Sequence, residues 1–371
     1  MTRGLDICIR GDGIVGNSLA LLLARENLRV GLLRQTRVEA GTADVRSYAL
    51  NARSRALIES LRCWPDGSHA TDIRAMHVRG DRGGEVRFVA SALGVESLGW
   101  IVDAAALETQ LGEAVRYQAQ IEILTEPRAA GLTVICEGRG SSTRNALGVE
   151  FSVTPYGQTA IASRLECEIA HEQTAHQWFS GGNILAFLPV DGPQGKTVAM
   201  VWSVGTDHAN TLIDMAPTDF CQALEAASHG CLGRVTQLGP RQTWSLQKAQ
   251  AQRWVGFHDG QAWLLAGDAA HHVHPLAGQG LNLGLADAEV LTRLLKSREY
   301  WRSVGDERLL RRYERQRKAD VLPVTSAMDA LQQLFARDSS SLQTLRNWGM
   351  DGFEHSGPLK SWVARQAMGL S

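Results

Sequence analysis

A glycine-rich turn near the start of this 371-residue chain constrains its fold more than any other feature. Residues 11–16 read GDGIVG, a GxGxxG pattern between a short apolar segment at 5–10 and an apolar helical segment at 14–26. A second apolar strand is expected at 28–33. Strand, glycine turn, helix and strand within about 30 residues predict a βαβ unit that binds a dinucleotide.

The three glycines of this turn, Gly11, Gly13 and Gly16, are the first candidate cofactor-binding residues. Glycine permits the tight turn, lets the backbone approach a pyrophosphate, and lets the helix pack closely on the strand. An acidic residue that binds the ribose is expected near position 34, but Arg34 stands there. An arginine can favour a 2′-phosphate or can turn outward to solvent, so this turn alone does not separate NAD from FAD.

Composition and charge exclude several classes of protein. Hydrophobic residues make up 44% of the chain and charged residues 21%, which is typical of globular proteins with a buried core. With 38 basic and 39 acidic side chains, the chain lacks the positive field that holds nucleic acid. Its six cysteines have no metal-binding spacing, and no apolar run of about 18 residues occurs. We therefore expect a cytoplasmic protein without a membrane span, a disulfide framework or a metal site.

A second glycine-rich motif, at 266–284, carries the cofactor assignment. Its sequence, AGDAAHHVHPLAGQGLNLG, resembles the second FAD fingerprint of the group A flavoprotein aromatic hydroxylases. In that family the aspartate meets the ribityl chain and the pyrophosphate region, and the proline and the glycine-rich helix start approach the flavin ring. The resemblance implies FAD-binding roles for Asp268, Pro275, Gly278, Gly280, Leu281 and Asn282.

Further segments resemble a subfamily, the ubiquinone-biosynthesis hydroxylases that oxygenate polyprenylated phenols. Arg46 belongs to a segment that contacts FAD in this family, so the resemblance adds it to the candidate cofactor-binding residues. The similarity covers almost the whole chain. The segments that carry it are 44–50, 186–190, 201–203, 313–318, 357–360 and 367–369.

The resemblance implies an FAD-dependent monooxygenase that hydroxylates the ring of a polyprenylated phenol in ubiquinone biosynthesis through a C4a-hydroperoxyflavin. The resemblance also implies NADH or NADPH as transient electron donor, and the lack of a second GxGxxG after a strand fits this. Dioxygen and a lipophilic aromatic substrate are the expected partners. An amphipathic segment with Leu359, Trp362, Val363 and Met368 suggests peripheral contact with the inner face of a membrane or with a biosynthetic complex. No catalytic base can be named from the sequence.

Three departures from the family pattern leave other hypotheses open. Arg34 replaces an acid, Glu137 replaces the aspartate of a third motif, and the interval 107–137 is shorter than the family pattern by roughly a β-hairpin of about 20 residues. These departures keep open a weakly active or non-catalytic accessory member of a ubiquinone-biosynthesis assembly. A nearer alternative is an FAD oxidoreductase that acts on another lipophilic substrate, because flavin motifs do not encode regiochemistry.

We expect an α/β fold with a Rossmann-like FAD-binding domain, a mixed β-sheet substrate domain and C-terminal helices. The FAD-binding domain is predicted to be discontinuous, because the two flavin motifs lie far apart in the sequence. The predicted boundaries are 1–71, 101–148 and 258–300 for the FAD-binding domain, 72–100 and 149–257 for the sheet domain, and 301–371 for the helical region.

Five individual residues carry further expectations. Pro323 is expected to break or kink the helical segment that contains it. Trp202, on a central strand, is a candidate to face an aromatic substrate. His271, His272 and His274 are expected to pack and hydrogen-bond near the cofactor rather than to bind a metal.

Overall fold

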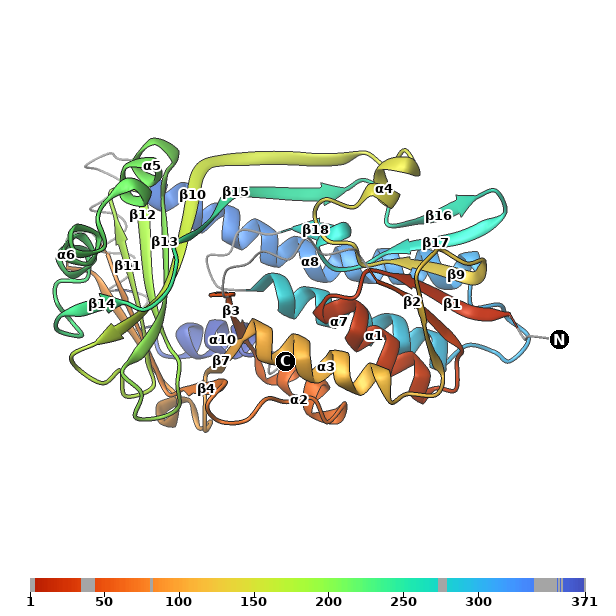
Figure 1. Cartoon of the computed structure of the whole chain (residues 1–371), viewed down its shortest axis with the longest axis horizontal. Helices are drawn as coiled ribbons and strands as arrows, with labels where there is room; N and C mark the ends of the chain where they lie inside the picture. Colours follow the sequence, from red (N-terminus) through yellow and green to blue (C-terminus); the bar gives the residue numbers. More distant parts are fainter. Residues whose placement is uncertain are drawn as a thin grey trace.

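Three β-sheets and the helices packed on them form an elongated α/β molecule, as predicted (Figure 1). The large sheet lies at one end of the molecule and the six-stranded sheet at the other. The computed structural model describes residues 4–34, 44–80, 83–272, 279–336, 352, 354 and 356–369.

A six-stranded sheet contains the predicted βαβ unit, since β1 pairs in parallel with β2 across the helix α1. The sheet has the order β16-β17-β9-β1-β2-β8 and is parallel except for the edge strand β16. Ile7, Cys8 and Ile9 are all buried because both faces of the central strand are covered. The strands are β1 (Leu5–Arg10), β2 (Val30–Leu33), β8 (Ile121–Leu124), β9 (Ala130–Ile135), β16 (Val255–His258) and β17 (Gln261–Leu265).

Helices cover this sheet. The helix α1 contacts both α3 and α7, and α7 contacts α8. The short interval before Glu137 holds β8 and β9, both of which belong to this sheet. The helices and short turns are α1 (Ile14–Arg25), α3 (Ala104–Arg116), α4 (Ser142–Ala146), η2 (Gly267–Ala269), α7 (Gln279–Lys296) and α8 (Glu307–Ala336).

A nine-stranded sheet forms the other end of the molecule. It has the order β18-β15-β10-β13-β12-β11-β5-β6, and β14 pairs with β10 beside this path. Its elements are β5 (Ala75–Arg79), β6 (Glu85–Val89), η1 (Ser91–Leu93), β10 (Phe151–Cys167), β11 (Thr174–Ser180), β12 (Asn183–Pro189), β13 (Thr197–Gly205), α5 (Thr206–Asp214), α6 (Pro217–Ala227), β14 (Val235–Gln237), β15 (Gln242–Ala251) and β18 (His271–His272).

The long strands β10 and β15 connect the two ends of the molecule. They pair antiparallel from Phe151 opposite Ala251 to Ala162 opposite Gln242, and Figure 1 shows them running from α4 to the large sheet. The register shifts between Pro155 and Gln158, where the chain bends through a bulge. Because this pair of strands extends into both ends of the molecule, the predicted domain boundaries stay a prediction.

A small three-stranded sheet lies between the two larger ones. Its order is β3-β7-β4, and it packs on the large sheet through a cluster that includes Ile73, Ile101 and Ala199. Asn51 caps the following helix by accepting a hydrogen bond from the Ser54 amide at 2.9 Å. The elements are β3 (Ser47–Leu50), α2 (Ala52–Ser60), β4 (Ala70–Ile73) and β7 (Gly99–Asp103).

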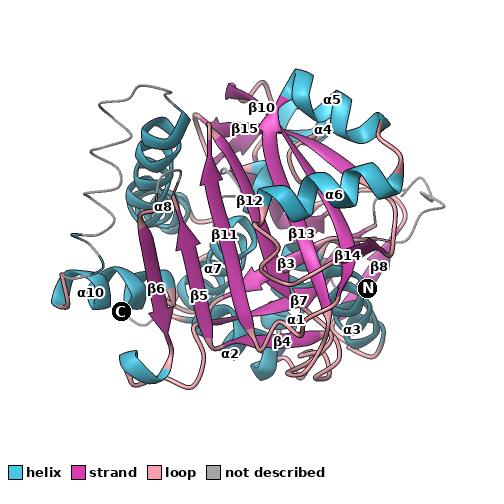
Figure 2. Ribbon diagram, turned by 90° about the vertical axis from the view of Figure 1, so that its left-hand side faces the viewer, coloured by secondary structure: helices cyan, strands magenta, loops and turns pink. Residues whose placement is uncertain are grey.

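The prediction that Trp202 faces an aromatic substrate is wrong. Trp202 packs in the cluster under α5 and α6, with its ring 6.2 Å from that of Phe220. Figure 2 shows α6 lying across this outer face of the sheet, whereas the opposite face turns toward β3 and α7 in Figure 1. Alternation along a strand showed which residues share a face, but the helices decide which face is covered.

Pro323 does not break its helix, since α8 continues through it from Glu307 to Ala336. Val321 and Thr325, on either side of the proline, are both buried. The proline cannot donate to the Ala319 carbonyl, four residues earlier, and the Thr325 hydroxyl donates to the Val321 carbonyl at 3.1 Å one turn further on. Packing of both helix halves against the protein therefore outweighs the cost of the proline.

None of the described helices combines the length and apolar character needed to cross a bilayer. The side chains of Leu359, Trp362 and Val363 in α10 (Pro358–Ala367) lie outside the described residues. Met368 is buried against the protein, and its carbonyl accepts a hydrogen bond from the Ala52 amide at 3.2 Å.

Truncation of Phe220 should destabilise the large sheet. Phe220 is fully buried and also lies under the Arg241 guanidinium, 4.3 Å from its ring. We expect F220A to lower the free energy of unfolding by about 3–5 kcal/mol, measured by urea denaturation. The exposed Phe257 provides the control, since F257A should change it by less than about 0.5 kcal/mol. A loss below about 1 kcal/mol in F220A would contradict this packing.

Candidate functional site

The predicted glycine turn is built from backbone in close contact. Gly11 has a φ of +107°, and a Cβ on it would lie 2.5 Å from the Cys136 carbonyl oxygen. A Cβ on Gly16 would lie 1.9 Å from the Gly11 carbonyl oxygen. Both positions therefore require glycine for the turn itself.

Gly13 has a different role, because a Cβ there would meet no atom within 4 Å. It directly precedes α1, whose first turn holds no acidic residue and whose N-cap makes no side-chain hydrogen bond. The first amides of α1 and the positive end of its dipole thus adjoin a gap. This cradle fits a pyrophosphate group.

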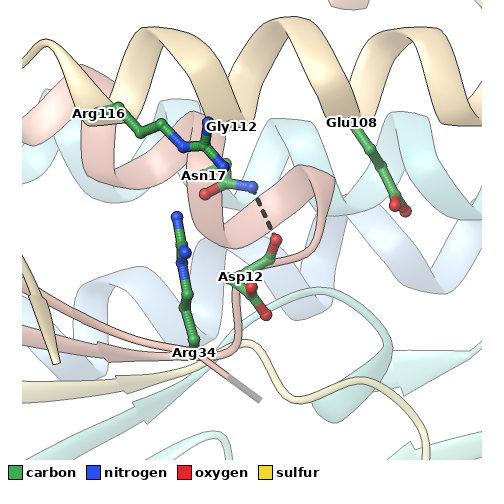
Figure 3. A pocket seen from close by; sticks show the side chains of 6 residues that line it. All are labelled: Asp12, Asn17, Arg34, Glu108, Gly112 and Arg116. Atoms are coloured by element: carbon green, nitrogen blue, oxygen red, sulfur yellow. Dashed lines mark hydrogen bonds between the residues drawn. The ribbon is translucent and has the colours of Figure 1, made fainter. Parts of the chain in front are cut away.

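A cavity of about 170 Å³ lies beside this turn (Figure 3). Figure 3 shows Arg34 pointing into it from the end of β2, toward Asn17 and Arg116. The side-chain amide of Asn17 donates through Nδ2 to the Asp12 carbonyl at 2.7 Å and closes one wall. Arg34 therefore occupies the place where a ribose-binding acid was expected, and it does not turn away from the site. The lining residues are Asp12, Asn17, Arg34, Glu108, Gly112 and Arg116.

Arg46 is held beside the second motif by carboxylates. Its Nη2 lies 2.7 Å from Asp44 Oδ2 and 3.5 Å from Glu108 Oε1. The hydrogen bonds with Asp44 raise the pKa of Arg46 above its ordinary value, so the guanidinium stays charged. Burial raises the pKa of Tyr48, with an opposing effect of Arg46 and an added effect of Asp268. The structure thus places Arg46 at the Tyr48 phenol, with its Nη1 3.5 Å from the hydroxyl oxygen, and Asp268 acts on the same phenol through its charge.

Asp268 follows β17 in a short loop. Its side chain is 41% exposed, and its Oδ2 lies 2.9 Å from His272 Nδ1. The residue before it, Gly267, has a φ of +62°. The carbonyl of the residue after it, Ala269, accepts a hydrogen bond from Arg144 Nη1 at 3.2 Å. The loop therefore presents the Asp268 carboxylate outward while its backbone is held from behind.

Asn282 joins the second motif to the three-stranded sheet. Its amide nitrogen donates to the Ala49 carbonyl at 2.9 Å, and its oxygen accepts from the Asn51 amide at 3.0 Å. Gly280 and Leu281 lie in the same first turn of α7 and are partly buried. Of the other predicted residues in this motif, Pro275, Gly278 and His274 lie outside the described residues.

Glu137, which stands where the family has aspartate, is well accommodated. Its Oε1 lies 3.0 Å from Arg10 Nε, and its Oε2 accepts from Ser141 Oγ at 2.7 Å and from the Thr143 amide at 3.0 Å. Burial raises the pKa of Glu137, but these hydrogen bonds and Arg10 outweigh it and lower the pKa. The longer side chain thus ties the end of β1 to the start of α4.

Sequence reasoning missed the carboxylate behind the second motif. Asp287 is fully buried on α7, between the buried Leu283 and Leu291. An acid in the middle of an apolar helix face was the available signal, because buried acids are almost always paired. The part of the chain that the structure describes contains no group of three or more side chains suited to a metal.

Comparison with known proteins identifies the family of this chain. The FAD binding domain family matches residues 76–327. Ubiquinone hydroxylase UbiL of Rhodospirillum rubrum is 31% identical and covers 98% of this chain and 89% of its own. The 3-demethoxyubiquinol 3-hydroxylase of Escherichia coli is 27% identical and covers 98% of both. The fold is also that of p-nitrophenol 4-monooxygenase PnpA from Pseudomonas putida, with a TM-score of 0.76, 16% identity and 99% coverage of both chains.

The glycine cradle, the second motif and these similarities define an FAD-dependent monooxygenase. More narrowly, the chain belongs to the family of FAD-dependent aromatic hydroxylases that includes the ubiquinone-biosynthesis hydroxylases. The predictions of FAD as cofactor and of this family are confirmed.

A side chain at Gly13 should block FAD without disturbing the fold. Because a Cβ there meets open space, we expect G13V to melt close to wild type and to bind FAD at least about 100-fold more weakly, measured by flavin fluorescence titration. G16A is the contrasting variant, since its Cβ would strike Gly11 and reduce the yield of folded protein. Unchanged FAD affinity in a folded G13V would contradict the cradle.

Removal of Arg34 should weaken FAD binding moderately. Its side chain points into the cavity beside the glycine turn, so R34A should raise the Kd for FAD by roughly threefold to tenfold. Arg29 is the matched control, because it pairs with Asp6 at 3.6 Å and does not line that cavity. Equal Kd values for R34A and R29A would show that the guanidinium contributes nothing.

Proposed function

We propose that the chain hydroxylates the aromatic ring of a polyprenylated phenol in ubiquinone biosynthesis. The observation that carries this proposal is the similarity to ubiquinone hydroxylases along nearly the entire chain, together with a site that keeps both flavin motifs. In the balanced reaction, a ring C–H bond, dioxygen, NADH or NADPH and a proton give a ring C–OH bond, the oxidised nicotinamide and water. FAD, when bound, accepts the two electrons from the nicotinamide and activates dioxygen.

The residues of the glycine turn and of the second motif would bind and orient the cofactor. The amides at the start of α1 would hold the pyrophosphate at Gly13, with Gly11 and Gly16 shaping the turn. Arg46 offers a fixed positive charge nearby, and Asp268 offers an acceptor for hydroxyl groups of the cofactor. Gly280 and Leu281, in the first turn of α7, would present backbone amides to the flavin.

The inner face of the large sheet would bind the substrate ring. Met200, Trp202 and Val204 of β13 pack in the cluster under α5 and α6. By alternation, Ala199, Val201 and Ser203 of the same strand point to the opposite face. That face turns toward β3 and α7 in Figure 1. Ala199 packs on the three-stranded sheet there, whereas the partly buried Val201 would contact the ring and help to exclude water from the reacting atoms.

The substrate also suggests where the enzyme works. A polyprenyl tail partitions into lipid, so the proposal includes peripheral contact with the cytoplasmic face of a membrane or with a biosynthetic assembly. The chemistry of the substrate supports this part.

The decisive assay combines the FAD-loaded protein with a prenylated phenol, NADH or NADPH, and ¹⁸O₂. We expect nicotinamide oxidation that depends on the phenol and a ring product carrying one labelled oxygen, as detected by mass spectrometry. FAD-free G13V is the control and should give no product. Oxidation of the nicotinamide without any hydroxylated product, for phenols with both short and long tails, would rule out this function.

A further inference from the structure

A buried ion pair lies directly behind the loop that carries Asp268. Asp287 has no exposed surface, and its Oδ1 lies 2.6 Å from Arg317 Nε. Arg317 is 1% exposed and also donates to the Leu283 carbonyl at 3.1 Å and to Asp320 Oδ2 at 2.8 Å. Burial acts to raise the pKa of Asp287, but His271 and Arg317 outweigh it, so the pKa is lowered and the carboxylate is ionised.

The other oxygen of Asp287 binds the two ends of the loop. Oδ2 accepts a hydrogen bond from the Gly267 amide at 2.8 Å and lies 2.7 Å from His271 Nε2. His271 is itself 2% exposed and stacks on Trp254, with ring centroids 4.9 Å apart. One oxygen atom thus fixes both the residue before Asp268 and the residue three positions after it.

The network gives the loop a fixed inner side and an open outer side. Arg144 holds the Ala269 carbonyl from within, at 3.2 Å, so the backbone is bonded on both sides of Asp268. Asp268 is the one exposed carboxylate of this segment, with 41% of its side chain accessible. A shift of Asp287 would therefore move Asp268 relative to the glycine turn.

We infer that Asp287 is the positioning residue of the FAD-binding loop Gly267–His272, and that Arg317 fixes the orientation of its carboxylate. The inference rests on the proposed role of Asp268 in binding FAD. Asp287 itself lies behind the loop and acts through its backbone and His271.

A simple helix-to-helix salt bridge is the competing explanation. Ion pairs of this kind stabilise a fold weakly or not at all compared with an apolar pair, because both charges lose their hydration. A role limited to joining α7 and α8 would also not require the bonds to Gly267 and His271. The two explanations differ in whether Asp287 affects FAD through Asp268.

The test measures the rate of FAD release from holoenzyme after dilution, followed by the rise in flavin fluorescence. We expect D287N to release FAD at least tenfold faster than wild type. E289Q is the matched control, because Glu289 lies two residues further along α7 and pairs with the exposed Arg53 at 2.7 Å. E289Q should release FAD at the wild-type rate. A wild-type rate in D287N overturns the inference.

A double-mutant cycle with D268A separates positioning from general stability. If Asp287 acts through Asp268, D287N should speed FAD release tenfold in the wild-type background and less than threefold in the D268A background. A tenfold effect in both backgrounds overturns the inference in favour of a purely structural role. A wild-type release rate in D268A alone instead shows that the proposed role of Asp268 fails.

A second pair of variants applies if D287N does not fold. H271Q keeps an N–H donor near the position of Nε2, whereas H271L removes it. We expect H271L to speed FAD release and H271Q to restore most of the wild-type rate. Equal rates in H271Q and H271L overturn the inference.

Discussion

The contact between backbone atoms at Gly11, Gly16 and Cys136 is the constraint on which the site depends. With no side chains at the two glycines, the end of β1, the start of α1 and the end of β9 meet directly. Close packing of these three segments leaves the amides of α1 beside an open gap at Gly13. A βαβ unit without this contact would keep its sheet but lose the place for a pyrophosphate.

The second motif completes the site from a different direction. It connects the large sheet with the helices on the six-stranded sheet, because β18 pairs with β15 while α7 packs on α1. Buried polar groups hold it at several points, with Asp287 behind the loop and Asn282 at the base of α7. The side that would face the cofactor carries exposed or partly exposed groups, and the side away from it is buried and held by hydrogen bonds from Asp287 and Arg144. Such an arrangement fixes ligand-facing groups before the ligand binds.

Much of this architecture could be predicted from local sequence. The glycine spacing predicted β1, α1 and β2, and the second motif identified the cofactor, because these features are encoded in consecutive residues. Trp202 could not be placed, since its environment depends on α5 and α6 packing on one face of the sheet. Pro323 was expected to break or kink its helix because local propensity ignores the buried contacts of Val321 and Thr325.

Partners distant in sequence explain the remaining differences. The Asp287 carboxylate meets Gly267 and Arg317, which lie 20 and 30 residues away. Glu137 looked like a departure from the family, yet Arg10, 127 residues away, supplies the charge that accommodates it. The apolar surroundings of Asp287 indicate that it is paired, but the local sequence identifies the partner of neither carboxylate.

The most direct test of the central claim is the visible absorption spectrum of the purified protein, followed by a stoichiometric FAD titration if the protein is colourless. Assembly of both motifs into one site predicts flavin absorption bands and about one bound FAD per chain. A folded protein that fails to take up FAD at micromolar concentration would show that the two motifs do not form an FAD site.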